Sequence, residues 1–133
     1  MNTTSGTPDE RLSRIFKAAS TPARIRILLA IGTGEACVCH LEAQLDLRQA
    51  YISQQLMEMR DAGLLDTRRD GRYIFYRLTE PLLINALIGI GKLFAIPAGE
   101  LLAQVTSDPL PHCCCPDCVE QDTPSIIHKE EIP

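Results

Sequence analysis

The sequence lacks any apolar run that approaches the roughly 20 residues needed to span a membrane. Its most apolar stretch, residues 82–98, is interrupted by Asn85, Lys92, Pro97 and several glycines. The first ten residues lack the basic segment and apolar core of a secretory signal. We therefore expect a cytoplasmic protein without membrane contact, whose six cysteines stay reduced. Cysteines in that compartment favour metal binding or redox chemistry over a disulfide framework.

The chain also lacks an overall excess of basic residues. Its formal net charge of −4 on its own argues against a nucleic-acid partner. The charge is unevenly distributed, however: residues 11–77 contain eleven Lys and Arg against seven Asp and Glu, whereas residues 1–10 carry −2 and residues 79–133 carry −6. A basic body between acidic ends can meet phosphate groups, so the distribution permits DNA binding.

No internal repeat or dominant low-complexity block divides the chain. Its 133 residues suit one domain with a modest core, or a protomer that completes its core by dimerising. Residues 1–8 are polar, and we expect them to be disordered. Residues 9–106 have the hydrophobic pattern of a folded domain. Residues 107–133 are rich in proline, cysteine and acidic residues, and we expect an irregular tail.

Apolar residues recur at helical spacing along most of the expected domain. They predict helices over residues 9–19, 22–31, 38–45, 48–62 and 81–94, with a kinked extension or separate turn over residues 98–105. In the second of these helices, Arg24 and Arg26 point away from the apolar face. The fourth helix is expected to bury Ile52, Leu56 and Met59.

A β-hairpin is predicted directly after the fourth helix. Two β-rich segments, residues 64–69 and 72–78, are separated by Asp70-Gly71, a dipeptide typical of tight hairpin turns. In the second segment two sets of side chains alternate, namely Tyr73, Phe75 and Arg77 against Ile74, Tyr76 and Leu78. One face should therefore pack, while the other meets solvent or phosphate.

The order of short helix, turn, longer helix and hairpin is that of a helix-turn-helix followed by a wing. We expect a mainly α fold of the α+β class, in which the second helix enters the major groove and a basic wing contacts the DNA backbone or minor groove. The predicted DNA contacts are Arg48, Gln49, Tyr51, Ser53, Gln54 and Gln55 in the helix and Arg68, Arg69, Arg72 and Arg77 in the wing. The alternative is a solvated polar helix in a small α+β domain that binds no nucleic acid.

Several segments in register resemble the ArsR/SmtB family of winged-helix, metal-responsive repressors. They are residues 23–28 (ARIRIL), 35–39 (EACVC), 52–56 (ISQQL), 63–65 (GLL) and 71–76 (GRYIFY). The resemblance covers residues 11–78. It implies a homodimer joined through the first and last helices, which addresses successive major grooves of an inverted repeat in double-stranded operator DNA. The family often has two histidines where this chain has Gln54 and Gln55.

Two cysteines two residues apart, Cys37 and Cys39, lie at the start of the short predicted helix. Residues at this spacing do not face each other on a regular helix. Both sulfurs can bind one ion only if the backbone leaves helical geometry or lies at the helix start. A soft ion bound there would distort the helix and weaken DNA affinity, a coupling typically worth about 1–3 kcal/mol. The alternative is two small buried hydrophobic side chains.

A second group of cysteines lies in the tail, in a proline-bounded segment that offers little for core packing. These residues are Cys113, Cys114, Cys115 and Cys118. Cys115 and Cys118 have chelating Cys-x-x-Cys spacing, and Cys113 or Cys114 reach Cys118 at slightly longer range. Arsenic-responsive members of the resembled family often add a third cysteine where this chain has Glu42. The tail of the same or the partner subunit could supply that thiolate, giving three sulfurs for As(III) or Sb(III), or four for Cd(II), Pb(II) or Zn(II).

We therefore expect a repressor, not an enzyme, that releases DNA when As(III) engages Cys37, Cys39 and tail cysteines. Cd(II), Pb(II) and Zn(II) are alternative inducers. A second hypothesis keeps DNA binding but changes the signal to oxidation or persulfidation, which would link Cys37 or Cys39 to the tail. A third is a thiol enzyme or metal carrier that uses Cys115 and Cys118; against it, no strand-to-helix setting precedes that pair.

Overall fold

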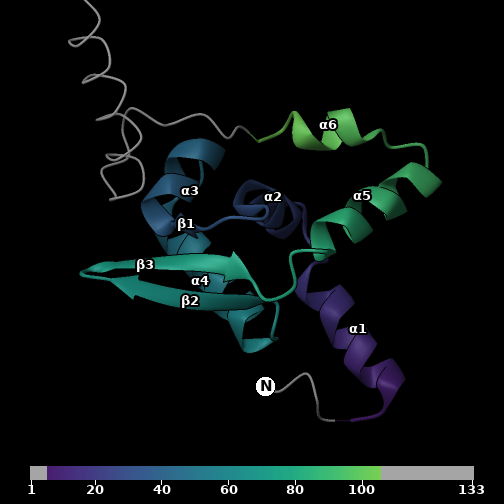
Figure 1. Cartoon of the computed structure of the whole chain (residues 1–133), viewed down its shortest axis with the longest axis horizontal. Coiled ribbons are helices and arrows are strands. Elements are labelled where there is room, and N and C mark those ends of the chain that lie inside the picture. The colour runs from purple at the N-terminus through teal and green to yellow at the C-terminus, as the bar shows by residue number, and fades with distance from the viewer. Residues whose placement is uncertain (1–5, 106–133) are drawn as a thin grey trace, which may run out of the picture.

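The computed structural model describes residues 6–105 and contains mainly helices with one three-stranded antiparallel sheet (Figure 1). The elements in chain order are α1 (Pro8–Ala18), α2 (Pro22–Ile31), β1 (Ala36–Cys37), α3 (Val38–Leu45), α4 (Gln49–Asp61), β2 (Leu65–Asp70), β3 (Tyr73–Leu78), α5 (Leu83–Leu93) and α6 (Ala98–Leu102). The predicted mainly α fold with a hairpin wing is confirmed. The expected tail, residues 107–133, lies outside the described residues, as do residues 1–5.

Helices α1 and α2 both begin at a Thr-Pro pair. The backbone N–H of Glu10 donates to Thr7 Oγ1 over 3.3 Å, and that of Arg24 donates to Thr21 Oγ1 over 3.2 Å. Threonine is a good N-cap, and proline is tolerated in the first turn because its missing N–H would have no intrahelical partner. Thr7 and Pro8, which we expected to be disordered, therefore belong to the start of α1.

The core fixes the orientation of the helix-turn-helix, which consists of α3 and α4. Ile52, Leu56 and Met59 of α4 are fully buried, as predicted, and pack in one cluster with fully buried residues of α2 and α3. Asp46, in the turn between the two helices, has a left-handed backbone at φ 56°. Aspartate adopts this conformation more readily than most residues. One side of α4 is thus held by the core, and the other is left for solvent.

The sheet contains one strand that the sequence did not predict. Its order is β1-β3-β2, and β1 pairs Ala36 with Tyr76 and Cys37 with Phe75. A two-residue strand is too short to show a periodic pattern. The hairpin of β2 and β3 was predicted, although its turn lies at Gly71-Arg72, one residue later than expected, with Gly71 at φ 63°.

Both faces of β3 are packed at its centre. We expected one of the two faces to meet solvent or phosphate, but Phe75 and Tyr76, on opposite faces, are only 1% and 8% exposed. Cys37 lies opposite Phe75 across the β1–β3 pair, and the two form a small buried cluster with Cys39 and Tyr73 packed against it. The expectation was wrong because β1 adds a strand to the hairpin and brings a cysteine side chain to that face.

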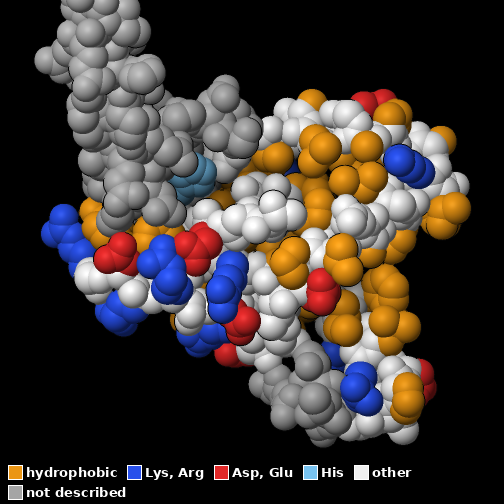
Figure 2. Space-filling view, in the orientation of Figure 1, with side chains coloured by type: hydrophobic (Ala, Val, Ile, Leu, Met, Phe, Trp, Pro, Cys, Tyr) orange, Lys and Arg blue, Asp and Glu red, His pale blue; other side chains and the backbone are white. Residues whose placement is uncertain are grey.

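Helices α1, α5 and α6 lie away from the tip of the hairpin (Figure 1). Large apolar side chains on these helices and their connections are exposed, namely Leu12, Phe16, Leu82, Ile90, Leu93, Phe94, Ile96 and Leu102. Figure 2 shows orange side chains gathered on this side of the molecule, whereas Lys and Arg side chains gather around the hairpin. Within residues 6–105, no helix has the length and apolar character needed to cross a membrane.

Candidate functional site

Helix α4 presents most of the predicted DNA-contacting residues on its solvent side. Arg48 is the N-cap residue of the helix, with extended backbone geometry. The side chains of Arg48, Gln49, Tyr51 and Gln54 are exposed, and that of Ser53 is half-buried. Because the opposite side of α4 lies in the core, this polar surface is fixed in direction. It has the residue types and the placement that a base-reading helix needs.

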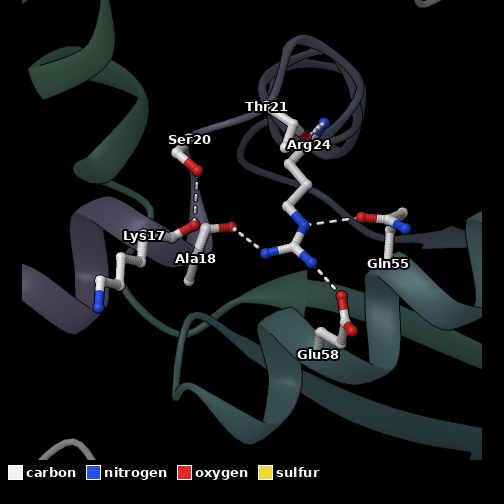
Figure 3. Close-up of polar contacts among 7 residues, drawn as sticks. All are labelled: Lys17, Ala18, Ser20, Thr21, Arg24, Gln55 and Glu58. Carbon is white, nitrogen blue, oxygen red and sulfur yellow. Dashed lines mark hydrogen bonds and ion pairs between the residues drawn. The ribbon is translucent and has the colours of Figure 1, made fainter.

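Gln55 lies differently: its amide is engaged within the protein, and its role as a DNA contact stays a prediction. Its side chain faces α2 and is 8% exposed. Its Oε1 accepts a hydrogen bond of 2.7 Å from Arg24 Nε (Figure 3). The spacing contains a signal for this orientation, since Gln55 follows the buried Ile52 by three residues and precedes the buried Met59 by four. A polar residue at such a position needs a buried partner, which here is Arg24.

The guanidinium group of Arg24 joins three helices. It donates from Nη1 to the carbonyl oxygen of Ala18 at the end of α1 over 3.3 Å, and it forms an ion pair from Nη2 with Glu58 of α4 (Figure 3). With Gln55, these contacts tie α1 and α2 to the back of α4. Sequence reasoning had Arg24 pointing away from the apolar face. Its side chain is only 15% exposed, so it is part of the packing around α4.

The arginines of the wing fall into two groups. Arg69, Arg72 and Arg77 are exposed, and the guanidinium of Arg72 lies 5.5 Å from the centroid of the Tyr73 ring. Arg68 is also exposed but is held against the sheet: its Nε and Nη2 donate to the Glu35 carboxylate over 2.7–3.1 Å. The same guanidinium lies 4.6 Å from the centroid of the Phe75 ring.

The contact between Arg68 and Glu35 also has an electrostatic consequence. The hydrogen bond that Arg68 donates holds the pKa of the Glu35 carboxyl below its ordinary value. Glu35 directly precedes β1, so this ion pair connects β2 of the wing to the strand that carries Cys37. Arg68, predicted to contact DNA, is engaged in a contact within the protein.

The cysteine pair lies at the junction of β1 and α3. Cys37 is the last residue of β1 and the N-cap of α3, with an extended backbone at φ −91° and ψ 169°. Its sulfur accepts a hydrogen bond from the backbone N–H of His40 over 3.4 Å. Cys39 lies in the first helical turn, and the two sulfurs are 2.9 Å apart. The pair therefore meets the requirement that it lie at a helix start, where both sulfurs can face one ion.

These two sulfurs fit part of a metal or metalloid site. Two sulfurs bound to one tetrahedral ion at about 2.3 Å lie roughly 3.8 Å apart, so the observed pair needs to open by about 1 Å. Within residues 6–105, no group of three or more His, Cys, Asp or Glu side chains is arranged to hold a metal ion. The predicted tail ligands Cys113, Cys114, Cys115 and Cys118 lie outside the described residues. The three-sulfur site thus remains a prediction.

A groove of about 350 Å³ brings the cysteine pair together with residues of the helix and the wing that were predicted to contact DNA. Cys37 and Cys39 line it, α4 contributes Gln49 and Ser53, and the wing contributes Arg72 and Tyr73. Residues predicted to bind a ligand and residues predicted to contact DNA, which are far apart in the sequence, thus line one groove. Sequence reasoning placed the pair in the first helix of the DNA-binding motif but did not predict this shared groove.

Comparison with known proteins identifies the family. The model of the bacterial regulatory protein arsR family matches residues 21–67. The biofilm growth-associated repressor of Agrobacterium fabrum is 39% identical over 87 residues, which cover 65% of this chain and 74% of the relative. The chain belongs to the ArsR family. It is therefore a DNA-binding transcriptional regulator and not an enzyme.

Other similar proteins show that members of the ArsR family differ in their regulatory roles. An arsenic resistance transcriptional regulator of Pseudomonas putida is 43% identical over 65 residues, covering 48% of this chain and 51% of the regulator. The solved structure of the transcriptional repressor BigR from Xylella fastidiosa superposes with a TM-score of 0.56 and 38% identity, covering 62% of this chain and 87% of BigR. The family thus establishes the class of protein but not the inducing ligand.

Proposed function

We propose that this ArsR-family regulator is a dimeric repressor of operator DNA that is released when As(III) or Sb(III) binds thiolates that include Cys37 and Cys39. The position of the cysteine pair carries the proposal: its sulfurs lie 2.9 Å apart at the start of α3, in the first helix of the DNA-binding motif. A ligand that opens the pair acts on Cys37 and Cys39 directly, and therefore on the backbone from which α3 begins.

Dimerisation supplies the second recognition helix that an inverted repeat requires. The exposed apolar surface of α1, α5 and α6 supports a second copy as its partner. The side chains of Leu93 and Phe94 are 80% and 74% exposed. Contiguous exposed apolar surface of this kind is typical of a protein–protein interface. We propose that residues 9–106 form the DNA-binding and dimerisation domain. The exposed residues of α4 would then read bases, and Arg69 and Arg72 would contact phosphates.

The ligand set requires sulfurs beyond the described pair. We propose that the tail, residues 107–133, supplies them from Cys113, Cys114, Cys115 or Cys118. One tail thiolate would complete three sulfurs for As(III) or Sb(III), and two would complete four for Cd(II), Pb(II) or Zn(II). The similarity to an arsenic resistance regulator supports As(III) as the first choice.

A thiol redox or persulfide signal is the second candidate function. The observation that favours it is the same short distance between Cys37 and Cys39, because neighbouring thiols exchange readily with oxidised sulfur. A disulfide forms between Cys37 and Cys39, or between one of them and a tail cysteine. An oxidant such as hydrogen peroxide or a polysulfide accepts the two electrons and the two thiol protons, and leaves as water or hydrogen sulfide. The DNA-binding surface is identical in the two functions, and only the input differs.

Titration of operator binding separates the two inputs. An operator selected from random-sequence duplexes would be bound to the full chain, and release would be followed by fluorescence anisotropy. Release by arsenite under excess reductant, lost in Cys37→Ser and Cys39→Ser, is expected. Cys115→Ser and deletion of residues 107–133 would test the tail ligands. Unchanged release after the deletion would contradict the assignment of tail cysteines as ligands. Release only by peroxide or polysulfide would overturn the As(III) proposal in favour of redox sensing.

A further inference from the structure

The cysteine pair opens into a groove on the side of the molecule that would face DNA in the proposed function. Cys37 itself is only 2% exposed, yet it lines the groove together with Cys39. The groove is also lined by the first two turns of α4, through Gln49 and Ser53, and by the start of β3. Among the described residues, a reagent therefore approaches Cys37 through the space between the recognition helix and the wing.

The polar residues that line this groove suit a segment of the DNA backbone. The described residues that line it include Arg72 and no carboxylate, and Gln49 and Ser53 offer neutral hydrogen-bond donors. Guanidinium, amide and hydroxyl groups are typical partners of phosphate oxygens. A duplex that places α4 in its major groove and is contacted by the wing must also pass across the space between those two elements.

We propose that operator DNA closes this groove over Cys37 and Cys39, so that a thiophilic ligand captures only the DNA-free protein. The inference rests on the proposed function and specifies why ligand binding and operator binding exclude each other. Distortion of α3 alone would allow protein, DNA and ligand to coexist in a ternary complex of weakened affinity. If DNA and ligand occupy the same groove, no ternary complex forms, and the phosphate backbone and the thiophile compete for one site.

The kinetics of DNA release distinguish competition from a ternary complex. Spontaneous dissociation of a fluorescent operator would be measured by stopped flow with excess unlabelled operator, and then with increasing arsenite. Competition predicts that release reaches a plateau at the spontaneous rate, whatever the arsenite concentration. Arg72→Ala should raise the spontaneous rate and the plateau by the same factor. Release that is faster than spontaneous dissociation and rises with arsenite would overturn the inference, because the ligand would then have entered the DNA-bound protein.

A second measurement holds even if arsenite does not act as inducer. Alkylation of Cys39 by iodoacetamide would be followed by peptide mass mapping, with saturating operator and with a scrambled duplex at a salt concentration where it does not bind. With roughly 5% of the protein free, alkylation should slow by about twentyfold. An unchanged rate in the operator complex would overturn the inference but not the proposed function. Protection without any release by arsenite would sustain the inference and overturn the proposed As(III) response.

Discussion

Arg24 and Arg68 form similar contacts in different surroundings. Each pairs with a carboxylate from a distant part of the chain, Glu58 for Arg24 and Glu35 for Arg68. The Arg24 side chain is 15% exposed and also binds the buried amide of Gln55, whereas the Arg68 side chain is 41% exposed and rests on the Phe75 ring.

The difference separates a stabilising contact from an orienting one. A buried polar group that loses its hydrogen-bond partner destabilises the fold by the full free energy of its desolvation. An exposed ion pair contributes little to the free energy of unfolding. Arg24 should therefore stabilise the fold and hold the back of α4. Arg68 should contribute little to stability and mainly set the wing against the strand that carries Cys37.

Substitution of Arg24 tests the buried contact and should have the largest effect. We expect Arg24→Ala to lower the free energy of unfolding by about 2–3 kcal/mol, because the buried amide of Gln55 loses its partner. Urea denaturation monitored by circular dichroism measures the change. Arg26→Ala, in the same helix, is the matched control and should cost less than about 1 kcal/mol. Equal losses in the two variants would remove the distinction drawn for Arg24.

Two neighbouring glutamines of α4, Gln54 and Gln55, allow its exposed side to be compared with its buried side. Gln54 is exposed, so Gln54→Ala should weaken operator binding by about 1–2 kcal/mol and relax base preference while leaving stability within about 0.5 kcal/mol. Gln55→Ala should lower stability and leave base preference unchanged, because its amide faces Arg24. Binding to a panel of single-base operator variants measures the preference. A changed preference in Gln55→Ala would identify that residue as a DNA contact.

These pairs show what the sequence could and could not predict. Hydrophobic periodicity was sufficient for the long helices and for the buried positions Ile52, Leu56 and Met59, because the apolar side of a helix repeats every turn. Polar residues on the same side, such as Gln55, are hidden from such a pattern. Their placement depends on a partner, Arg24, that lies 31 residues away.

The shared groove was missed for a related reason. Residue types predicted a cysteine pair and a wing, and the positions of α3 and the hairpin were correct. Contact between them depends on β1, whose two residues leave no periodic trace, and on the pairing of Cys37 with Phe75. Tertiary pairing at this scale follows from the folded sheet and not from local preference.

Two adjacent arginines of the wing test whether Arg68 is reserved for Glu35. Each phosphate that a cation neutralises adds about 0.9 to the slope of log affinity against log salt concentration. Arg69→Ala should therefore reduce the slope for operator binding by about one. Arg68→Ala should leave the slope unchanged and cost at most about 1 kcal/mol of stability. A reduced slope in Arg68→Ala would mean that Arg68 leaves Glu35 to bind phosphate.

The pH dependence of stability should show the smallest effect, through Glu35. Its pKa is lower in the folded protein than in the unfolded chain because Arg68 hydrogen-bonds the ionised carboxylate. A lowered folded-state pKa gives stability that is present above the unfolded-state pKa and is lost as the pH falls through the folded-state value. Glu35→Gln should thus be slightly less stable than the unsubstituted chain at pH 6, and the difference in melting temperature should shrink towards pH 3. A difference that stays constant with pH would mean that the charge of Glu35 contributes nothing, and the orienting role of Arg68 would then rest on the Phe75 ring alone.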